Sequence, residues 1–440
     1  MRLHFFRRFD YVILLCVLTL TAFGILFIYS AGINSDGALI SKEYIKQIVW
    51  AGIGFFALIC MALFDYRRLK RYVPYIYIVL LLTLIYIRLL GHESHGARSW
   101  IGIGSLGIQP AELGKIIYIL FLAWYLERTP NENPRKRFIV ALLIMCLPMG
   151  LILLQPDLGT ASVYLPIFIC MCFMTNIPFR YLMLVIGTGI LTIIFTVLPI
   201  YQDSILHRTI PIISVFTNTK LRLLVIMAAL AITLIGTLGQ IIFKNRYYYW
   251  ITYVFGIITM ALLLSMAAGK VLKPYQTMRL IVFLDPSSDP QGSGWHITNS
   301  KIAIGAGGLW GRGFKQGTQS HYHFIPEQNT DFIFSILAEE AGFWGGMVVF
   351  AGFLVLMLRI IQIIRNTPNM FGSFIAAGIL GMFFFHFVEN VGMVMGIMPI
   401  TGIPLPFLSY GGSSLLTAMI SAGLLMSISS RRLDFNVEAL

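Results

Sequence analysis

An aspartate stands where a polar loop becomes an apolar helix. The stretch Ile325–Glu340 reads "IPEQNTDFIFSILAEE", and Asp331 is the first residue of the expected helix. An acid in this position gains about 0.3–1 kcal/mol from the helix dipole and the free amide groups. Asp331 could therefore be a structural acid, with Thr330 as a helix cap. It could equally be a general base that takes a proton from a substrate.

A second group of polar residues lies in "IQPAELGKIIYILFLAWYL". Gln109, Glu112 and Lys115 recur every three residues, so they lie close to one face of a helix. They could form an internal ion pair, or they could line a cavity with Lys115 available to a phosphate. Just before them, "GARSWIGIG" contains Arg98, a headgroup anchor or phosphate ligand, and Trp100, which suits an interfacial aromatic belt.

One pair of acids and one pair of histidines are weaker candidates. Glu339 and Glu340 lie some two turns inside the helix from Asp331, and we favour a structural role in hydrogen bonding over a place on a cavity floor. His321 and His323 form an H-x-H pair that could bind a metal, but histidines in a glycine-rich loop more often hydrogen-bond to water. The sequence shows no dedicated metal cage.

The amino-acid composition indicates the class of protein to which these residues belong. Of 440 residues, 58% are hydrophobic and 12% are charged, and the mean hydropathy is +0.81. A soluble domain has about 25% charged residues. Apolar runs of about 20 residues, enough to cross roughly 30 Å of hydrocarbon, recur throughout. The sequence therefore predicts an all-α polytopic membrane protein, a single integral membrane domain over residues 1–440.

The charges and cysteines fit this class. The net charge of +13 indicates anchors beside acidic lipid headgroups rather than nucleic-acid binding. All five cysteines fall in apolar segments, so we expect no disulfide and no metal site. They are Cys16, Cys60, Cys146, Cys170 and Cys172.

About twelve membrane spans are expected. The first is too long for a cleaved signal peptide and is interpreted as a retained anchor. The spans are 11–30, 46–64, 73–90, 109–126, 138–154, 158–175, 179–200, 221–243, 247–268, 332–358, 370–395 and 409–428.

Basic residues predict the orientation, because short cytoplasmic loops are enriched in lysine and arginine. Both termini are expected in the cytoplasm. The loops 91–108 and 396–408 and the long polar segment 271–330 are then on the outer face. The basic residues lie in alternate loops: Arg67, Arg68, Lys70 and Arg71; Arg128, Arg135, Lys136 and Arg137; Lys244 and Arg246; Arg359 and Arg365; Arg431 and Arg432.

The long outer segment contains several large apolar residues, which disfavour disorder. A loop of this length is usually functional or disordered. We expect it to fold back on the outer membrane surface, with glycines such as Gly311 and Gly313 forming sharp turns.

The motifs together resemble the SEDS family (shape, elongation, division and sporulation). The matching pieces are "GARSWIGIG", "QPAELGK", "QPDLGT", "LDPSSDPQGSGWHITNSKIAIGAGGLWGRG", "GTQS", "IPEQNTDFIF" and "GIPLPFLSYGGSS". They occur in the family's order over nearly the whole chain. "DPSSDPQGSG" and the Pro-Glu before Asn-Thr-Asp favour the elongation branch over a division or sporulation paralogue.

The resemblance implies a peptidoglycan glycosyltransferase of the bacterial cytoplasmic (inner) membrane that polymerises lipid II for cell elongation and rod shape. It implies partnership with a class B penicillin-binding protein, a transpeptidase, and with the elongation machinery. The family's essential aspartate matches Asp331, and its fourth-helix glutamate and lysine match Glu112 and Lys115.

A mechanism follows as a hypothesis. Asp331 accepts the proton of an acceptor 4-hydroxyl, which attacks the donor's anomeric carbon with inversion and releases undecaprenyl pyrophosphate. Cations stabilise the diphosphate, and Mg²⁺ or Mn²⁺ could assist. The expected substrate-binding residues are Arg98, Trp100, Gln109, Glu112, Lys115, Arg279, Lys301, Arg312, Lys315, Gln319, Glu327 and Thr330.

The sequence departs from the family pattern in three places. Asn329 stands where members commonly have histidine, and Asn299 and Ala306 replace the usual glutamine and serine. The family has ten spans, so Leu221–Phe243 and Tyr247–Ala268 would be an extra hairpin within residues 201–270.

Two other classes of function remain open. The first is a flippase or transporter for lipid-linked precursors, which should place its charges near the midplane on repeated, broken helices. The second is a non-catalytic scaffold for a transpeptidase, in which Asp331 could be replaced without loss.

Overall fold

The chain forms two compact helical units. The computed structural model describes residues 9–90, 92–94, 97–100, 107–202, 210–271, 273–322 and 324–431. Unit 1 comprises Met1–Asn176 and Trp295–Leu440, and unit 2 comprises Ile177–Gly294. All the expected site residues except Arg279 belong to unit 1.

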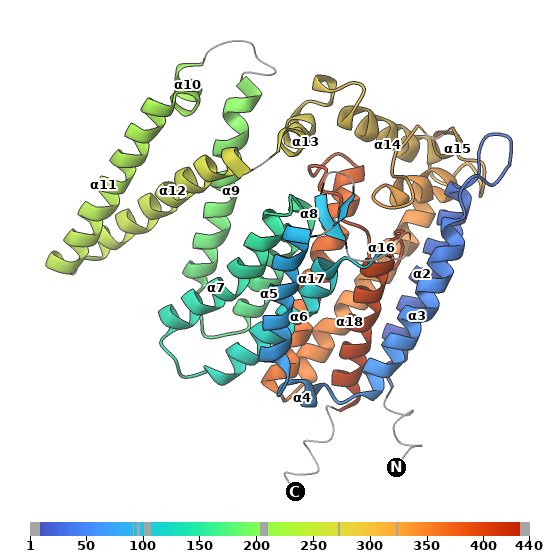
Figure 1. Cartoon of the computed structure of the whole chain (residues 1–440), viewed down its shortest axis with the longest axis horizontal. Helices are drawn as coiled ribbons and strands as arrows, with labels where there is room; N and C mark the ends of the chain where they lie inside the picture. Colours follow the sequence, from blue (N-terminus) through green and yellow to red (C-terminus); the bar gives the residue numbers. More distant parts are fainter. Residues whose placement is uncertain are drawn as a thin grey trace, which may run out of the picture. The chain divides into compact units, whose positions relative to one another are not determined.

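Unit 1 is a bundle of helices with one small β-hairpin (Figure 1). The hairpin was not expected from the sequence, and it pairs β1 with β2 in antiparallel fashion. The elements are α2 (Tyr11–Ala31), α3 (Glu43–Leu63), α4 (Tyr66–Leu69), α5 (Val73–Leu90), β1 (His92–Ser94), β2 (Ala97–Trp100), α6 (Pro110–Arg128), α7 (Pro134–Leu153), α8 (Leu158–Phe173), α14 (Ser293–Gly307, most of it in this unit), α15 (Thr318–His321), α16 (Ile333–Asn366), α17 (Met370–Val394) and α18 (Gly412–Ser430).

Unit 2 contains the remaining helices. Helices α11 and α12 pack against each other, and α12 also packs on α9. The elements are α9 (Phe179–Tyr201), α10 (Pro211–Thr217), α11 (Thr219–Phe243), α12 (Arg246–Val271), α13 (Pro274–Leu284) and the 3₁₀ helix η3 (Pro286–Ser288). That residues 201–270 are an insertion relative to the family remains a prediction.

Every expected span corresponds to a helix in the described part of the chain. Ten of these helices are long and apolar enough to cross a membrane. The other two are α6, which contains four charged residues, and α8, a shorter apolar helix. Segment 271–330, expected as one long loop, contains α13, η3, α14 and α15.

Helices α17 and α18 form the interior of unit 1. In their most apolar windows 72% and 78% of the residues are buried, against 28% for the exposed helix α3. Helix α17 packs against α6, α8 and α16, and α18 packs against α3. Polar side chains on α17 are therefore enclosed by protein, where each needs a partner.

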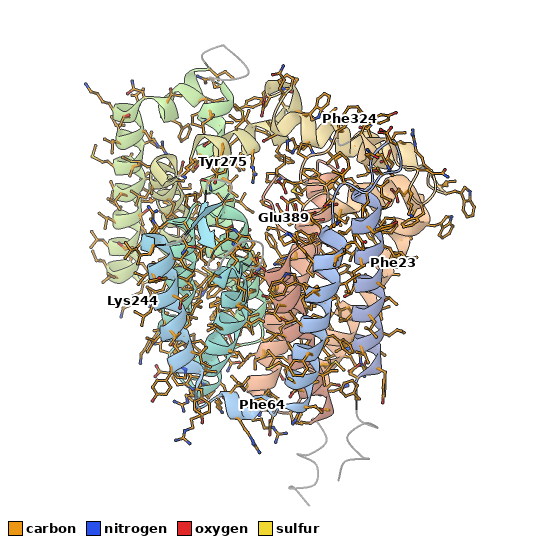
Figure 2. The ribbon with its side chains drawn as sticks, turned by 45° about the vertical axis from the view of Figure 1, so that its right-hand side comes forward. Phe23, Phe64, Lys244, Tyr275, Phe324 and Glu389 are labelled. Carbon is orange, nitrogen blue, oxygen red and sulfur yellow. The ribbon has the colours of Figure 1, made fainter. Side chains whose placement is uncertain are left out.

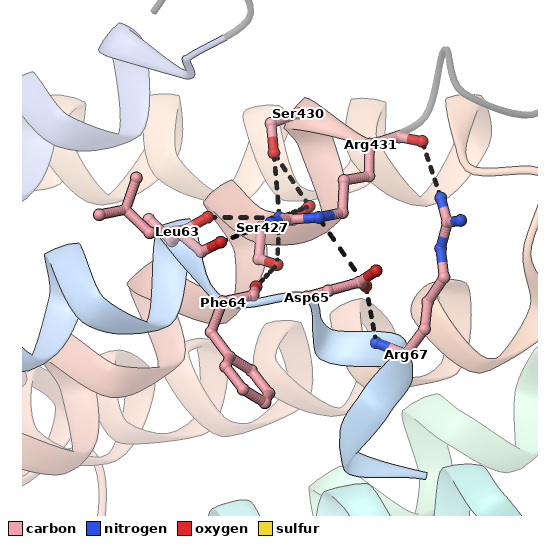
Figure 3. Close-up of polar contacts among 8 residues, drawn as sticks. Leu63, Phe64, Asp65, Arg67, Ser427, Ser430 and Arg431 are labelled. Atoms are coloured by element: carbon pink, nitrogen blue, oxygen red, sulfur yellow. Dashed lines mark hydrogen bonds and ion pairs between the residues drawn. The ribbon is translucent and has the colours of Figure 1, made fainter. Parts of the chain in front are cut away.

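The end of unit 1 that contains α4 lies opposite the end that contains α14 and α15 (Figure 1). At the α4 end, Arg431 donates to the carbonyl of Leu63 at 2.6 Å and to Ser427 Oγ at 2.8 Å, while Arg67 donates to the carbonyl of Arg431 at 3.1 Å (Figure 3). Cations at helix C-termini satisfy unpaired carbonyls and oppose the helix dipole. These expected cytoplasmic arginines therefore also join α3, α4 and α18.

Candidate functional site

The residues before α16 form a turn that delays the start of the helix. The helix begins at Ile333, and its N-cap is Phe332, which has no side-chain capping bond. The amides of Thr330 and Asp331 both donate to the carbonyl of Glu327, at 3.2 Å. The expectation that Thr330 caps the helix is therefore wrong, since its hydroxyl donates to the same carbonyl at 3.1 Å. Asp331 lies two residues before the helix and is half-buried.

This turn is fixed to two other helices. Asn390 of α17 is fully buried, and its side-chain amide donates to the carbonyls of Asp331 and Ile403, both at 2.8 Å. Gln328 donates to the carbonyl of Ala31, the last residue of α2, at 2.7 Å. The backbone at Asp331 is thus held by the interior of unit 1 rather than left as a mobile loop.

Glu112 and Lys115 form a buried ion pair. The Lys115 ammonium lies 2.8 Å from Glu112 Oε1 and 3.1 Å from His386 Nε2, and the lysine side chain is only 1% exposed. The other ring nitrogen of His386 lies 3.0 Å from the carbonyl oxygen of Pro404. An ammonium that is buried with two partners is not presented to solvent. This arrangement matches the ion-pair interpretation of the i, i+3 spacing, and contact of Lys115 with a phosphate stays a prediction.

Helix α17 connects this ion pair to the Asp331 turn. His386 and Asn390 are four residues apart, so they lie on one helix face a single turn from each other. Between them Glu389, also buried, accepts a hydrogen bond from Thr401 Oγ1 at 2.9 Å. Figure 2 shows Glu389 inside unit 1, between Phe324 and Phe64 and nearer the Phe324 end.

Helix α14 lies along the first turns of α16. The hydroxyl of Ser300 donates to the carbonyl of Val394 and lies 2.7 Å from the hydroxyl of Ser335 in α16. The next residue, Lys301, is exposed and lies against Gly396, where an added Cβ would be 2.5 Å from Nζ. Lys301 is thereby placed between the C-terminal end of α17 and the start of α16.

Glu339 and Glu340 hold the glycine-rich segment in place. Glu339 accepts from the amides of Thr318 and Gln319 at 2.7 and 2.9 Å, and Glu340 accepts from the hydroxyl of Ser30 at 2.6 Å. Both acids are buried. The structural interpretation of this pair, as hydrogen-bond acceptors, is confirmed. The bonds to Glu339 also fix Gln319 in the first turn of α15.

Three expected residues lie near the start of α6. Gln109 donates to Asp157 Oδ2 at 2.6 Å and its amide donates to Ser413 Oγ at 2.9 Å, so it connects α6 to α8 and α18. Trp100 ends β2 and is half-buried. Arg98 lies in the same strand, but its side chain is outside the described part of the structure.

The other expected cations are dispersed. Arg312 donates to Thr318 Oγ1 at 2.8 Å, and Lys315 lies 4.6 Å from the centre of the Tyr29 ring. Arg279 belongs to unit 2, so its place relative to Asp331 is not described. The described residues contain no cluster of three or more metal-ligating side chains. His323 lies outside them, and the ring of His321 faces the Asn34 carbonyl at 3.3 Å.

Sequence reasoning missed the polar face of α17. His386, Glu389 and Asn390 interrupt an apolar span at i, i+3 and i+4. Ionisable residues within a membrane span are functional candidates by default, which is the signal that could have identified them.

Comparison with known proteins places the chain in a family. The family model FTSW_RODA_SPOVE, described as cell cycle protein, matches residues 10–240 and 206–433. Peptidoglycan glycosyltransferase RodA of Treponema pallidum is 51% identical over 433 residues, covering 98% of this chain and 100% of the relative. MrdB of Escherichia coli K12, also named a peptidoglycan glycosyltransferase, is 30% identical, covering 96% and 94%. Stage V sporulation protein E of Bacillus subtilis is 32% identical, covering 96% of each.

Solved structures agree on the fold. A chain from a peptidoglycan synthase complex that coordinates polymerization and crosslinking has a TM-score of 0.67 at 26% identity, covering 96% of this chain and 98% of that one. The crystal structure of Thermus thermophilus RodA has a TM-score of 0.60 at 24% identity, covering 96% and 97%. The chain belongs to the FtsW/RodA/SpoVE family, the SEDS family that its motifs resemble.

Proposed function

We propose that this chain is a peptidoglycan glycosyltransferase that polymerises lipid II into glycan strands for cell-wall elongation, with Asp331 as its general base. Its similarity to RodA of Treponema pallidum extends over the whole of both chains. The observation that supports the role of Asp331 best is its setting. Its side chain is half-buried and its backbone carbonyl is fixed by the fully buried Asn390.

The reaction needs one proton transfer and one displacement. Asp331 accepts the proton of the acceptor's 4-hydroxyl as that oxygen attacks the anomeric carbon of the donor. The new C–O bond forms as the bond to the diphosphate breaks, so the configuration inverts. The leaving diphosphate is a weak base and takes no proton, so the enzyme must stabilise negative charge instead.

Lys301 is the best placed cation for this charge among the described residues of unit 1. It is exposed, whereas Lys115 is buried with Glu112 and His386. Its neighbour Ser300 contacts Ser335, which lies four residues after Asp331. The described residues offer no group of three metal ligands, and no step here is assigned to a resident metal.

The orientation in the membrane is part of the proposal. Basic loops favour the cytoplasm, which places both termini inside and the start of α16 on the outer face of the cytoplasmic membrane. A substrate with a lipid tail and a sugar headgroup reacts at this boundary.

A transpeptidase partner, a class B penicillin-binding protein, completes the proposal, with the elongation machinery around it. A chain of the same fold has been solved within a complex that coordinates polymerization and crosslinking. The glycan strands made by one protein would be crosslinked by the other.

The test is polymerisation of purified lipid II by the protein in liposomes, with a partner whose transpeptidase serine is blocked. The partner alone is the control. We expect glycan polymer only when both proteins are present. Movement of fluorescent lipid II across the bilayer without polymer would favour a flippase, and neither activity would favour a scaffold.

A further inference from the structure

Three segments that are distant in the sequence meet beside the Asp331 turn, and each contributes one polar residue. Asn329 donates from Nδ2 to Glu43 Oε2 at 2.5 Å, and Glu43 is the first residue of α3. The backbone amide of Tyr410 donates to the carbonyl of Asn329 at 2.8 Å. Glu43, Asn329 and Tyr410 are all half-buried. Polymerisation as described above assigns no role to any of them.

A buried glutamine fixes this group. Gln47 lies one turn after Glu43 in α3 and is fully buried. Its side chain donates to the carbonyl of Ser409 at 3.1 Å and accepts from the amide of Gly411 at 3.4 Å. Tyr410 lies between these two residues, so its position relative to Glu43 is set by α3. Burial raises the pKa of the Tyr410 hydroxyl and the nearby charge of Glu43 raises it further.

Asn329 joins this group to the proposed base along the chain. Asn329 precedes Asp331 by two residues, and two residues span at most roughly 7 Å. A carboxylate accepts hydrogen bonds, an amide both donates and accepts, and a phenol does either. These groups suit the hydroxyls and the N-acetyl group of an amino sugar. Because the three residues are half-buried, a sugar can reach them, and their hydrogen bonds to one another hold them in place.

We propose that Glu43, Asn329 and Tyr410 form the subsite for the acceptor sugar, an N-acetylated hexose whose free 4-hydroxyl reaches Asp331. This inference rests on the proposed glycosyltransferase function. The Glu43 carboxylate accepts a hydrogen bond from one hydroxyl of the sugar, and the Tyr410 phenol binds another. The subsite orients the ring so that the oxygen to be deprotonated faces the base.

Two substitutions distinguish binding of the acceptor sugar from structural support of the turn that contains Asn329. Tyr410→Phe removes the hydroxyl and leaves the backbone amide that holds Asn329. Glu43→Gln removes the charge but keeps an oxygen that can accept from Asn329. Tyr44→Phe is the matched control, because Tyr44 is next to Glu43 and its ring packs on Tyr29, 5.0 Å between centroids.

The assay uses the full chain with its blocked partner and two defined substrates. The donor is a lipid diphosphate glycan whose terminal 4-hydroxyl is capped, so it cannot accept. The acceptor is a disaccharide lipid with a phosphonate in place of the diphosphate, so it cannot donate. One coupling event is then measured as a function of each concentration. Thermal unfolding and partner binding report folding for every variant.

We expect Tyr410→Phe and Glu43→Gln to raise KM for the acceptor about three- to tenfold, as the loss of one hydrogen bond would. The donor KM and the saturating rate should stay within about twofold, and Tyr44→Phe should match the wild type. An unchanged acceptor KM for Tyr410→Phe, or a loss confined to the saturating rate, overturns the subsite. If the wild type itself forms no product, the proposed function fails instead.

Discussion

At the scale of single residues, the site depends on how Asp331 is held. A general base is effective only when it lies within hydrogen-bond reach of the proton it removes. The side-chain amide of Asn390 donates one hydrogen bond to the carbonyl of Asp331 and one to the carbonyl of Ile403. The proposed base is therefore positioned through its backbone by a residue that is itself buried. Preorganisation of this kind avoids the cost of ordering the loop when substrate binds.

Lys301 gives the first prediction at this scale. Lys301→Gln should lower kcat/KM for polymerisation about tenfold or more, because hydrogen bonds to charged groups are the stronger ones. Lys301→Arg should retain more activity, since it keeps the charge. Lys42→Gln is the matched control, because Lys42 is also exposed and its side chain makes no capping bond to α3. Equal activity of the Lys301→Gln variant and the wild type would show that Lys301 does not stabilise the leaving diphosphate.

Spacing along the sequence predicts local pairs but not their distant partners. The i, i+3 spacing predicts that Glu112 and Lys115 share a helix face, and they form an ion pair. Nothing in that spacing identifies His386, which lies 271 residues away. Partners of this kind depend on how α6 and α17 pack, and that information is not local.

At the scale of elements, α16 is two helices joined at a break. Gly342 has φ 64° and ψ −160°, which only glycine adopts without strain. Beside the break, the amides of Arg312 and Gly313 donate to the carbonyls of Glu339 and Glu340, both at 3.0 Å. The glycine-rich segment thus satisfies carbonyls at the end of the first helix. That short helix, which follows Asp331, is fixed by the segment that precedes it.

The break predicts a strong effect of a single methyl group. In Gly342→Ala the new Cβ would lie 2.2 Å from the amide nitrogen of Gly311, in addition to the backbone strain. We expect a loss of about 1–3 kcal/mol from strain alone, seen as a lower thermal unfolding midpoint in detergent. Gly150→Ala in α7 is the control, because nothing lies within 4 Å of its added Cβ. Equal unfolding midpoints for the two variants would contradict the close approach of the backbone at Gly342 to that at Gly311.

The buried ion pair gives a second prediction for elements. Lys115→Met alone should destabilise unit 1 by about 3–5 kcal/mol, because Glu112 would remain buried without its partner. Adding Glu112→Leu should recover much of the loss. The exposed pair Lys136–Glu132 is the control, with side chains 65% and 38% exposed. Lys136→Met should leave the unfolding midpoint close to that of the wild type, because exposed ion pairs contribute little. A full loss in the double variant would show that the pair does more than tether α6.

The helices were predictable and the details around the site were not. Twelve apolar runs correspond to helices because length and hydropathy suffice to specify a span. The break at Gly342 depends on its close approach to Leu309, Trp310 and Gly311, which lie about 30 residues earlier in the chain. The late start of α16 depends on the turn at Glu327, which competes with helix capping by Thr330.

At the scale of the whole molecule, the two ends of unit 1 differ in chemistry. The α4 end contains arginines that cap helices, while the opposite end contains the Asp331 turn, α14 and α15 (Figures 1 and 3). The basic residues of the loops predicted from the sequence that these arginines and the segment 271–330 lie at opposite ends.

The orientation is testable with single cysteines. In a background with all five native cysteines replaced, Lys42→Cys should react with a membrane-impermeant maleimide in intact spheroplasts. Lys136→Cys should react only after permeabilisation. Both positions are exposed, so access depends on the side of the membrane. Labelling of both positions in intact spheroplasts, or of Lys136→Cys alone, would contradict the proposed topology.

The proposed role of Asp331 is tested most directly by measuring polymerisation of lipid II by Asp331→Asn together with the partner. The substitution keeps the shape of the side chain and the carbonyl that Asn390 holds, and removes only the basic carboxylate. Asp36→Asn, in the exposed loop between α2 and α3, is the matched control. We predict a rate about 10²–10⁴ times below wild type for Asp331→Asn, with unfolding midpoint and partner binding unchanged, and a normal rate for Asp36→Asn. Wild-type polymerisation by a folded Asp331→Asn variant would contradict the account and return Asp331 to a structural role.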